Sequence, residues 1–155
     1  MVEVIFWGSI FLMLYVYLGY PVVIAVLAYI KKDRHLLKKD YEPTVSLIIA
    51  AYNEEKVIAK KIENSLELDY PKDKLEIIVF SDASTDRTDE IVKSYSDRGI
   101  KLFRIEGRKG KAYCKNIVAE KAQGEILVFS DANSIYERNA IKKLVVHFAD
   151  PKVGC

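Results

Sequence analysis

Hydrophobic and polar residues form two different patterns along the chain. No charged residue occurs from Val4 to Ile30, whereas from Thr44 onward short apolar runs alternate with segments that carry apolar residues at helical spacing. The apolar runs predict strands at 45–50, 75–80, 100–105 and 126–129. The other segments predict helices at 54–68, 86–95, 111–122 and 139–148. Strands that alternate with helices indicate a parallel sheet covered by helices.

The order of the strands follows from the handedness of their connections. Crossovers between parallel strands are right-handed, so the second and third strands are expected on one side of the first strand and the fourth on its other side. The predicted fold is α/β, a doubly wound parallel sheet in the order 3-2-1-4 with helices on both faces. Gly124 is predicted to end the third helix.

The apolar segment at the start of the chain is long enough to cross a bilayer. As one helix, Val4 to Ile30 would measure about 40 Å at ~1.5 Å per residue, more than the ~30 Å hydrocarbon core. Trp7 and Tyr29 lie near its two ends, where aromatic residues favour the membrane interfaces. The segment lacks the basic start and small-residue cleavage site of a signal peptide. We therefore predict one transmembrane helix at residues 1–30.

Basic residues follow the apolar segment, and none precedes it. They are Lys31, Lys32, Arg34, Lys38 and Lys39. The positive-inside rule then predicts a single-pass protein of the cell membrane, with its N-terminus outside and its domain in the cytoplasm. We interpret residues 31–43 as a basic juxtamembrane linker, either a solvated tether or a contact to anionic headgroups. Residues 44–155 are the predicted folded domain.

Composition disfavours several other classes of protein. The formal net charge is +2, so no global basic field indicates a nucleic-acid partner. Cys114 and Cys155 have no neighbouring histidines and no paired spacing, which supports neither a zinc site nor a disulfide framework.

Two nearly identical sequences mark the ends of the second and fourth predicted strands. They are EIIVFSDAS at 76–84 and EILVFSDAN at 125–133. Asp82 and Asp131 are therefore expected on one rim, about 10 Å apart on either side of the first strand at ~4.8 Å per strand. Doubly wound sheets bind ligands at this rim. A nucleotide would suit the pair, with one carboxylate near its base or ribose and the other facing its phosphates through Mg²⁺ or Mn²⁺.

Each of these residues also has a purely structural interpretation. Asp82, Ser84 and Asp86 can form an Asx turn and a helix N-cap, the role that we favour for Asp86. The sequence from Asp131 to Asn133 is a common turn composition. The basic loop Gly107–Lys111 precedes a helix and is compatible with a phosphate contact or a solvated loop. Its spacing differs from GxxxxGK[ST], and no GxGxxG follows a strand, which disfavours an ordinary phosphate-loop or dinucleotide enzyme.

Three ordered motifs resemble the nucleotide-sugar half of family 2 glycosyltransferases, whose membrane-attached members polymerise or export polysaccharides. The motifs are VSLIIAAYNEE, EIIVFSDASTDRT and RKGKAYCKNIVAEKAQGEILVFSDAN. The resemblance runs from about Thr44 to residue 155. It implies the family's Rossmann-like fold, which uses the strand order predicted above, and a nucleotide-sugar donor, which we expect to be a UDP-sugar.

The resemblance also implies roles for individual residues in donor binding. These residues are Tyr52, Asn53, Glu54, Asp82, Arg108, Lys111 and Asp131. The first three would line the uracil and ribose end of the donor, and Asp82 would bind the base. Lys111, together with Arg108, would approach the ribose or the diphosphate.

The metal site implied by the resemblance departs from the family pattern at one position. Asp131 and Asn133 occupy the two ends of the family's Asp-x-Asp element, which binds a divalent metal and the sugar nucleotide. Asn133 can offer a carbonyl oxygen but carries no charge. We therefore expect weak affinity for Mg²⁺ or Mn²⁺, or a metal that rests mainly on Asp131 and the diphosphate.

The resemblance further implies that the catalytic base, an aspartate, lies beyond residue 155. Glu137 and Asp150 are better interpreted as surface residues of a helix. The chain is therefore expected to carry the donor-binding half of an enzyme that transfers sugar with inversion to a saccharide or lipid-linked acceptor, with another chain as one way to complete the fold. Two alternatives stay open: a noncatalytic membrane-anchored interaction domain and a nucleotidyltransferase. The second would carry a glycine-rich loop where AYNEE stands.

Overall fold

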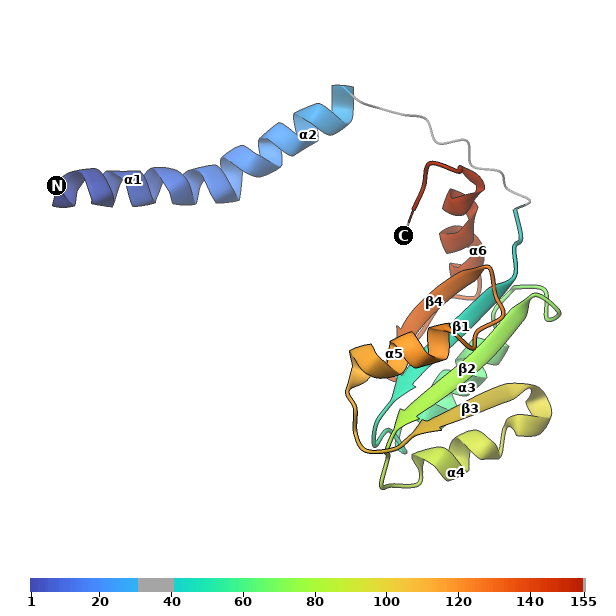
Figure 1. Cartoon of the computed structure of the whole chain (residues 1–155). Coiled ribbons are helices and arrows are strands. Elements are labelled where there is room, and N and C mark those ends of the chain that lie inside the picture. The colour runs from blue at the N-terminus through green and yellow to red at the C-terminus, as the bar shows by residue number, and fades with distance from the viewer. Residues whose placement is uncertain (31–40, 155) are drawn as a thin grey trace. The chain divides into compact units, whose positions relative to one another are not determined.

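The structure, a computed structural model, describes residues 1–30 and 41–154 (Figure 1). The chain divides into two compact units, Met1–His35 and Leu36–Cys155. The basic linker predicted at residues 31–43 lies mostly outside the described residues.

The first unit is a single bent helix. It runs through α1 (Val2–Leu14), a π-helical turn (Tyr15–Gly19) and α2 (Tyr20–Ile30). Figure 1 shows the bend where α1 gives way to α2. Pro21 accounts for it, because proline lacks an N–H and crowds the carbonyl four residues earlier, and a wide π turn accommodates this. The helix has 29 residues and a mean hydropathy of 2.3 over its most apolar window, so by length and composition it could cross a membrane.

The second unit is built on a four-stranded parallel sheet. Its strands are β1 (Val45–Ala51), β2 (Leu75–Asp82), β3 (Ile100–Ile105) and β4 (Ile126–Asp131). Their order is β3-β2-β1-β4, with every neighbouring pair parallel. This confirms the order predicted from right-handed crossovers.

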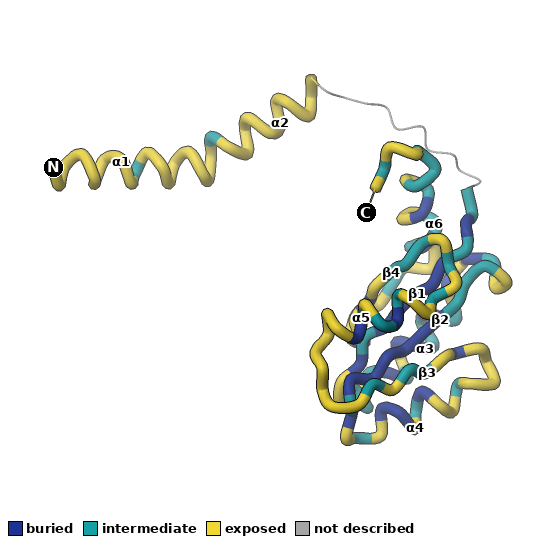
Figure 2. Tube along the Cα trace, in the orientation of Figure 1, coloured by how far each residue is buried: buried dark blue, intermediate teal, exposed yellow. Residues whose placement is uncertain are grey.

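Helices cover both faces of this sheet, and the alternation of side chains along β1 decides which residues each face buries. The helices are α3 (Ile58–Leu66), α4 (Thr88–Lys93), α5 (Lys111–Ala119) and α6 (Ala140–Val145), with 3₁₀ turns at Ser96–Arg98 and Val146–Ala149. Leu47 and Ile49 pack in one core with residues of α3, α4 and α6, whereas Ile48 packs in a second core with α5. Figure 2 shows β1 and β2 as the most deeply buried strands.

All four helices of this unit are shorter than the sequence pattern predicts. The helix expected from residue 54 begins at Ile58, because the carbonyl of Glu54 accepts the N–H groups of Val57 and Ile58 in a turn that follows Asn53 at φ 53°. The helix expected to reach residue 122 ends at Ala119.

Gly124 has a different role from the helix stop predicted for it. A Cβ at this position would lie 2.3 Å from the backbone nitrogen of Ser46. This nitrogen belongs to β1 and cannot move aside. The Gly124 N–H donates to the Ser46 hydroxyl at 2.9 Å. Glycine is therefore required by close approach to β1 rather than by the end of α5.

Candidate functional site

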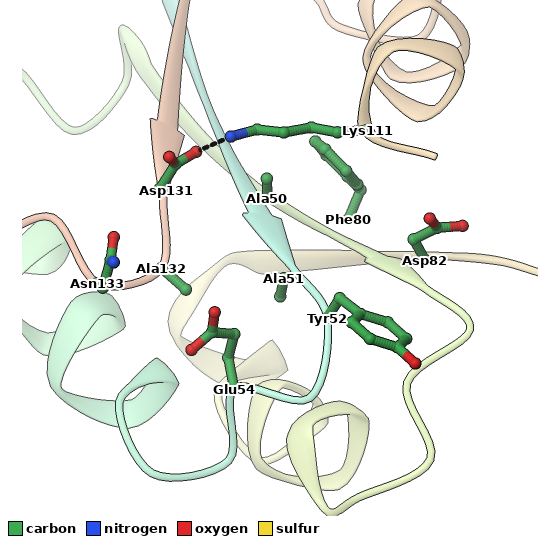
Figure 3. A pocket seen from close by; sticks show the side chains of 10 residues that line it. All are labelled: Ala50, Ala51, Tyr52, Glu54, Phe80, Asp82, Lys111, Asp131, Ala132 and Asn133. Carbon is green, nitrogen blue, oxygen red and sulfur yellow. Dashed lines mark hydrogen bonds and ion pairs between the residues drawn. The ribbon is translucent and has the colours of Figure 1, made fainter. Parts of the chain in front are cut away.

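An open cleft lies at the carboxyl ends of β1, β2 and β4 (Figure 3). Strand pairing places Ala50, Phe80 and Asp131 level with one another, and Asp82 lies two residues beyond Phe80. Since side chains alternate along a strand, all four project to the face covered by α5. The residues that line the cleft are Ala50, Ala51, Tyr52, Glu54, Phe80, Asp82, Lys111, Asp131, Ala132 and Asn133.

The cleft brings together most of the residues that the sequence indicates. Tyr52, Glu54, Asp82, Lys111, Asp131 and Asn133 all line it. Asn53 and Arg108 are not among the lining residues. The Asn53 side-chain oxygen instead accepts the N–H of Thr85 at 2.8 Å, which fastens the end of β1 to the loop after β2. The Arg108 guanidinium stacks 4.6 Å from the centre of the Tyr52 ring, at the edge of the cleft.

Asp82 is almost buried, and it anchors the basic loop. Its side chain accepts the N–H of Lys109 at 2.8 Å with one carboxylate oxygen and the N–H of Gly110 at 2.9 Å with the other. Positive φ angles at Gly107, Arg108 and Gly110 turn the loop so that these amides converge on the carboxylate. Two N–H groups of the basic loop, for which the sequence allowed a phosphate contact, thus bind Asp82 instead. Burial and the neighbouring Asp82 also raise the pKa of Cys114 to about 11, which keeps that thiol neutral.

Asp131 is exposed and pairs with a side chain rather than with the backbone. The Lys111 ammonium, at the first residue of α5, donates to one of its carboxylate oxygens across the cleft (Figure 3). This hydrogen bond is the main cause that lowers the pKa of Asp131 below its usual value, so the group is ionised at neutral pH. The pair neutralises both charges at the place where a diphosphate was expected.

The described residues fit a divalent ion that takes only part of its coordination from protein. Asp131 and Asn133 both offer oxygen atoms to the cleft, and Glu54 also lines it (Figure 3). Among residues 1–30 and 41–154 no cluster of three or more His, Cys, Asp or Glu side chains could enclose a metal. Mg²⁺ is commonly held by one or two carboxylates together with substrate phosphates and water, so this donor set suits a metal that arrives with a diphosphate.

Lys61 is a polar residue near the site that sequence reasoning missed. It is completely buried on α3, where its ammonium donates to the Ser134 carbonyl at 2.7 Å and lies 3.9 Å from the centre of the Tyr136 ring. Desolvation lowers the pKa of Lys61 to about 8, and the negative charge of Asp131 partly opposes this. A lysine between Ile58 and Ile62 on the apolar stripe of a helix was the available signal.

The structural interpretation of Asp86 is confirmed for the Asx turn but not for the helix N-cap, because the N-cap residue of α4 is Arg87. One of its carboxylate oxygens accepts the N–H of Thr88 at 3.0 Å, which forms the predicted Asx turn before α4. The other accepts the N–H of Glu55 at 3.0 Å and ties this turn to the end of β1. Asp86 therefore holds together the segments that follow β1 and β2, and it does not line the cleft.

Comparisons with known proteins agree with this architecture. Residues 46–155 match Glycosyl transferase family 2. The beta-monoglucosyldiacylglycerol synthase of Nostoc sp. is 34% identical over 155 residues, which covers 96% of this chain and 32% of that protein. The probable glycosyltransferase YdaM of Bacillus subtilis is 37% identical over 118 residues, which covers 72% of this chain and 28% of that protein.

Solved structures give the same result. The mannosyltransferase PcManGT from Pyrobaculum calidifontis, in complex with GDP-Man and Mn²⁺, superposes with a TM-score of 0.80 at 34% identity and covers 90% of this chain and 43% of its own. S. aureus TarS 1–349 in complex with UDP-GlcNAc has a TM-score of 0.62 at 29% identity and covers 66% and 30%.

The parallel sheet with its cleft at the rim has the Rossmann-like fold of these solved glycosyltransferases. The chain belongs to glycosyl transferase family 2. It spans less than a third of the length of the two curated relatives compared above.

Proposed function

We propose that this chain is the donor-binding part of a membrane-attached glycosyltransferase. The observation that carries the proposal is that Asp82, Lys111 and Asp131 line one and the same cleft, at the carboxyl ends of β1, β2 and β4. Relatives of the same fold were solved with GDP-Man and with UDP-GlcNAc, which supports a nucleotide sugar as donor. The sugar would pass to a saccharide or lipid-linked acceptor, and a UDP-sugar is our expected donor.

The charges of the cleft suit the two ends of such a donor. Tyr52, stacked with Arg108, offers an aromatic face beside Asp82, which would receive the base and ribose. Lys111 and Asp131 lie on the other side, where the diphosphate would be held. On donor binding the Lys111 ammonium would exchange the Asp131 carboxylate for a phosphate oxygen, because a diphosphate presents more negative charge at the same place.

Asp131 and Asn133 are the residues that would hold a divalent ion, Mg²⁺ or Mn²⁺. Bound there, the ion would stabilise the negative charge of the departing nucleoside diphosphate. The residues of this chain would then fix the donor so that its anomeric carbon faces the acceptor hydroxyl.

The chemical step needs a further group. Inverting transfer requires a base that takes the proton from the acceptor hydroxyl, and we propose that this base lies outside these 155 residues. The volume of the cleft, about 210 Å³, supports this division of roles, because it is below the ~300–1,000 Å³ of sites that bury a whole small ligand. The described residues therefore account for the nucleotide end of the site.

The N-terminal helix is proposed to anchor the protein in the cell membrane. Its length and apolar composition support a single span, and the basic residues from Lys31 to Lys39 support a cytoplasmic domain with the N-terminus outside. The match to the Nostoc synthase covers 96% of this chain and therefore extends into this helix.

Isothermal titration of the full chain in detergent tests the proposal. UDP- and GDP-sugars are titrated in parallel with Mn²⁺ present. We expect binding of one class and a loss of about 100-fold or more in Asp131→Ala, since this change removes the carboxylate proposed for the metal. Asp97→Ala is the matched control, because Asp97 lies in the exposed 3₁₀ turn Ser96–Arg98 away from the cleft.

The result that contradicts the proposal is equally definite. No binding of any nucleotide sugar by the wild-type chain, or equal affinity in wild type and Asp131→Ala, would favour the noncatalytic interaction domain. Membership of a glycosyltransferase family already disfavours the nucleotidyltransferase alternative.

A further inference from the structure

A buried cation lies beneath the segment that follows β4. Lys61 is completely buried, yet its ammonium contacts a neutral carbonyl, that of Ser134, and the face of the Tyr136 ring. Taking an ammonium group out of water is costly, and a methionine of similar length would fill the same space without that cost. A lysine at this position therefore requires a specific reason.

A second residue of α3 holds the same segment. The Asn64 side chain donates to the Tyr136 carbonyl at 2.9 Å and accepts the Tyr136 N–H at 2.8 Å. Residues three apart lie on one face of a helix, so Lys61 and Asn64 reach the segment together. Lys61 holds its start at Ser134 and Asn64 holds its end at Tyr136.

The held segment continues directly from the residues that line the cleft. Asp131 and Asn133 come immediately before Ser134, and the Ser134 N–H itself bonds the Asp131 carbonyl at 3.1 Å. Beyond Asp131 this segment has left the sheet. Its contacts to α3 therefore hold the backbone that directly follows Asn133.

We propose that Lys61 and Asn64 are positioning residues for the diphosphate end of the donor site. They hold the segment that directly follows Asp131 and Asn133, and the charged form of Lys61 adds a positive field where the diphosphate binds. Their effect is confined to phosphate recognition and leaves the nucleoside end, at Tyr52 and Asp82, unchanged. This inference rests on the proposed function.

The test compares ligands with and without phosphate on the full chain. Uridine and guanosine, then UDP and GDP, are titrated with Mn²⁺ into wild type, Lys61→Met and Asn64→Ala. We expect Lys61→Met to weaken nucleoside diphosphate binding about tenfold and nucleoside binding by less than about twofold, since supporting residues of this kind usually contribute 10- to 100-fold. Asn64→Ala should show a smaller loss with the same selectivity. Lys60→Met, at the neighbouring exposed lysine, is the matched control.

The selectivity separates positioning from general stability. A partly unfolded variant would lose nucleoside and nucleoside diphosphate affinity together, so equal losses overturn the inference, as does unchanged diphosphate binding in Lys61→Met. If that variant does not fold, Asn64→Ala decides by the same criterion. A wild-type chain that binds neither diphosphate overturns the proposed function and this inference with it, whereas wild-type binding with unaffected variants overturns this inference alone.

Discussion

The ends of β2 and β4 share the sequence Val-Phe-Ser-Asp-Ala but use the aspartate differently. Asp82 is 8% exposed, and two backbone amides bind its carboxylate. The side chain of Asp131 is 53% exposed, and its carboxylate is paired with the exposed side chain of Lys111. The same local sequence thus gives a fixed anchor in one place and an exchangeable partner in the other.

The position of each strand in the sheet explains the difference. β2 lies between β3 and β1, so the loop after β3 passes over its end and supplies amides to Asp82. Among the described strands β4 pairs with β1 alone, so its end stays open to the cleft. In the loop after each of these strands, a carbonyl accepts a hydrogen bond from a cationic side chain. Arg104 donates to the Ser84 carbonyl at 3.1 Å after β2, and Lys61 donates to the Ser134 carbonyl at 2.7 Å after β4.

The first prediction contrasts the two aspartates by their effect on folding. Asp82→Ala should lower the free energy of unfolding by about 2 kcal/mol, because it removes two hydrogen bonds to a charged, nearly buried group. Asp131→Ala should change it by less than about 0.5 kcal/mol, since its ion pair is exposed. Urea denaturation followed by circular dichroism measures both. An equal loss of unfolding free energy in the two variants would show that the two aspartates do not differ in their contribution to folding.

The second prediction concerns Lys111 and has a smaller effect. Lys111→Met frees the Asp131 carboxylate, so Mn²⁺ alone should bind about threefold more tightly, in line with the ~0.2–1 kcal/mol of exposed ion pairs. The same variant should bind nucleoside diphosphates more weakly, because it has lost a phosphate contact. Calorimetry gives both constants, with Lys93→Met as the control, because Lys93 is an exposed lysine on α4 that does not line the cleft. A change of the same sign for both ligands would contradict this role.

Periodicity and connection handedness were sufficient to predict the fold of the domain from sequence. The apolar runs predicted all four strands, and their order followed without any knowledge of side-chain contacts. It was likewise predictable that Asp82 and Asp131 lie on one side of the sheet. They occupy the same position in two matching sequences, and side chains alternate between the two faces along each strand. Six of the eight predicted site residues line the cleft for this reason.

Other features depend on contacts between residues distant in sequence and could not be read from local pattern. The backbone conformation of Arg108 and its neighbouring glycines decides that loop amides bind Asp82 rather than remain free. Gly124 is fixed by its approach to Ser46 across the sheet. The contact of Lys61 with Ser134 joins residues 73 positions apart.

Amide NMR of the isotopically labelled chain, titrated with the nucleoside diphosphate that binds and with Mg²⁺, tests the central claim most directly. If one cleft receives the ligand, signals from Ser81–Ser84 and from Ser130–Asn133 should shift together at the same ligand concentration. Shifts at only one strand end, or at neither, would contradict the claim that Asp82 and Asp131 serve a single nucleotide site.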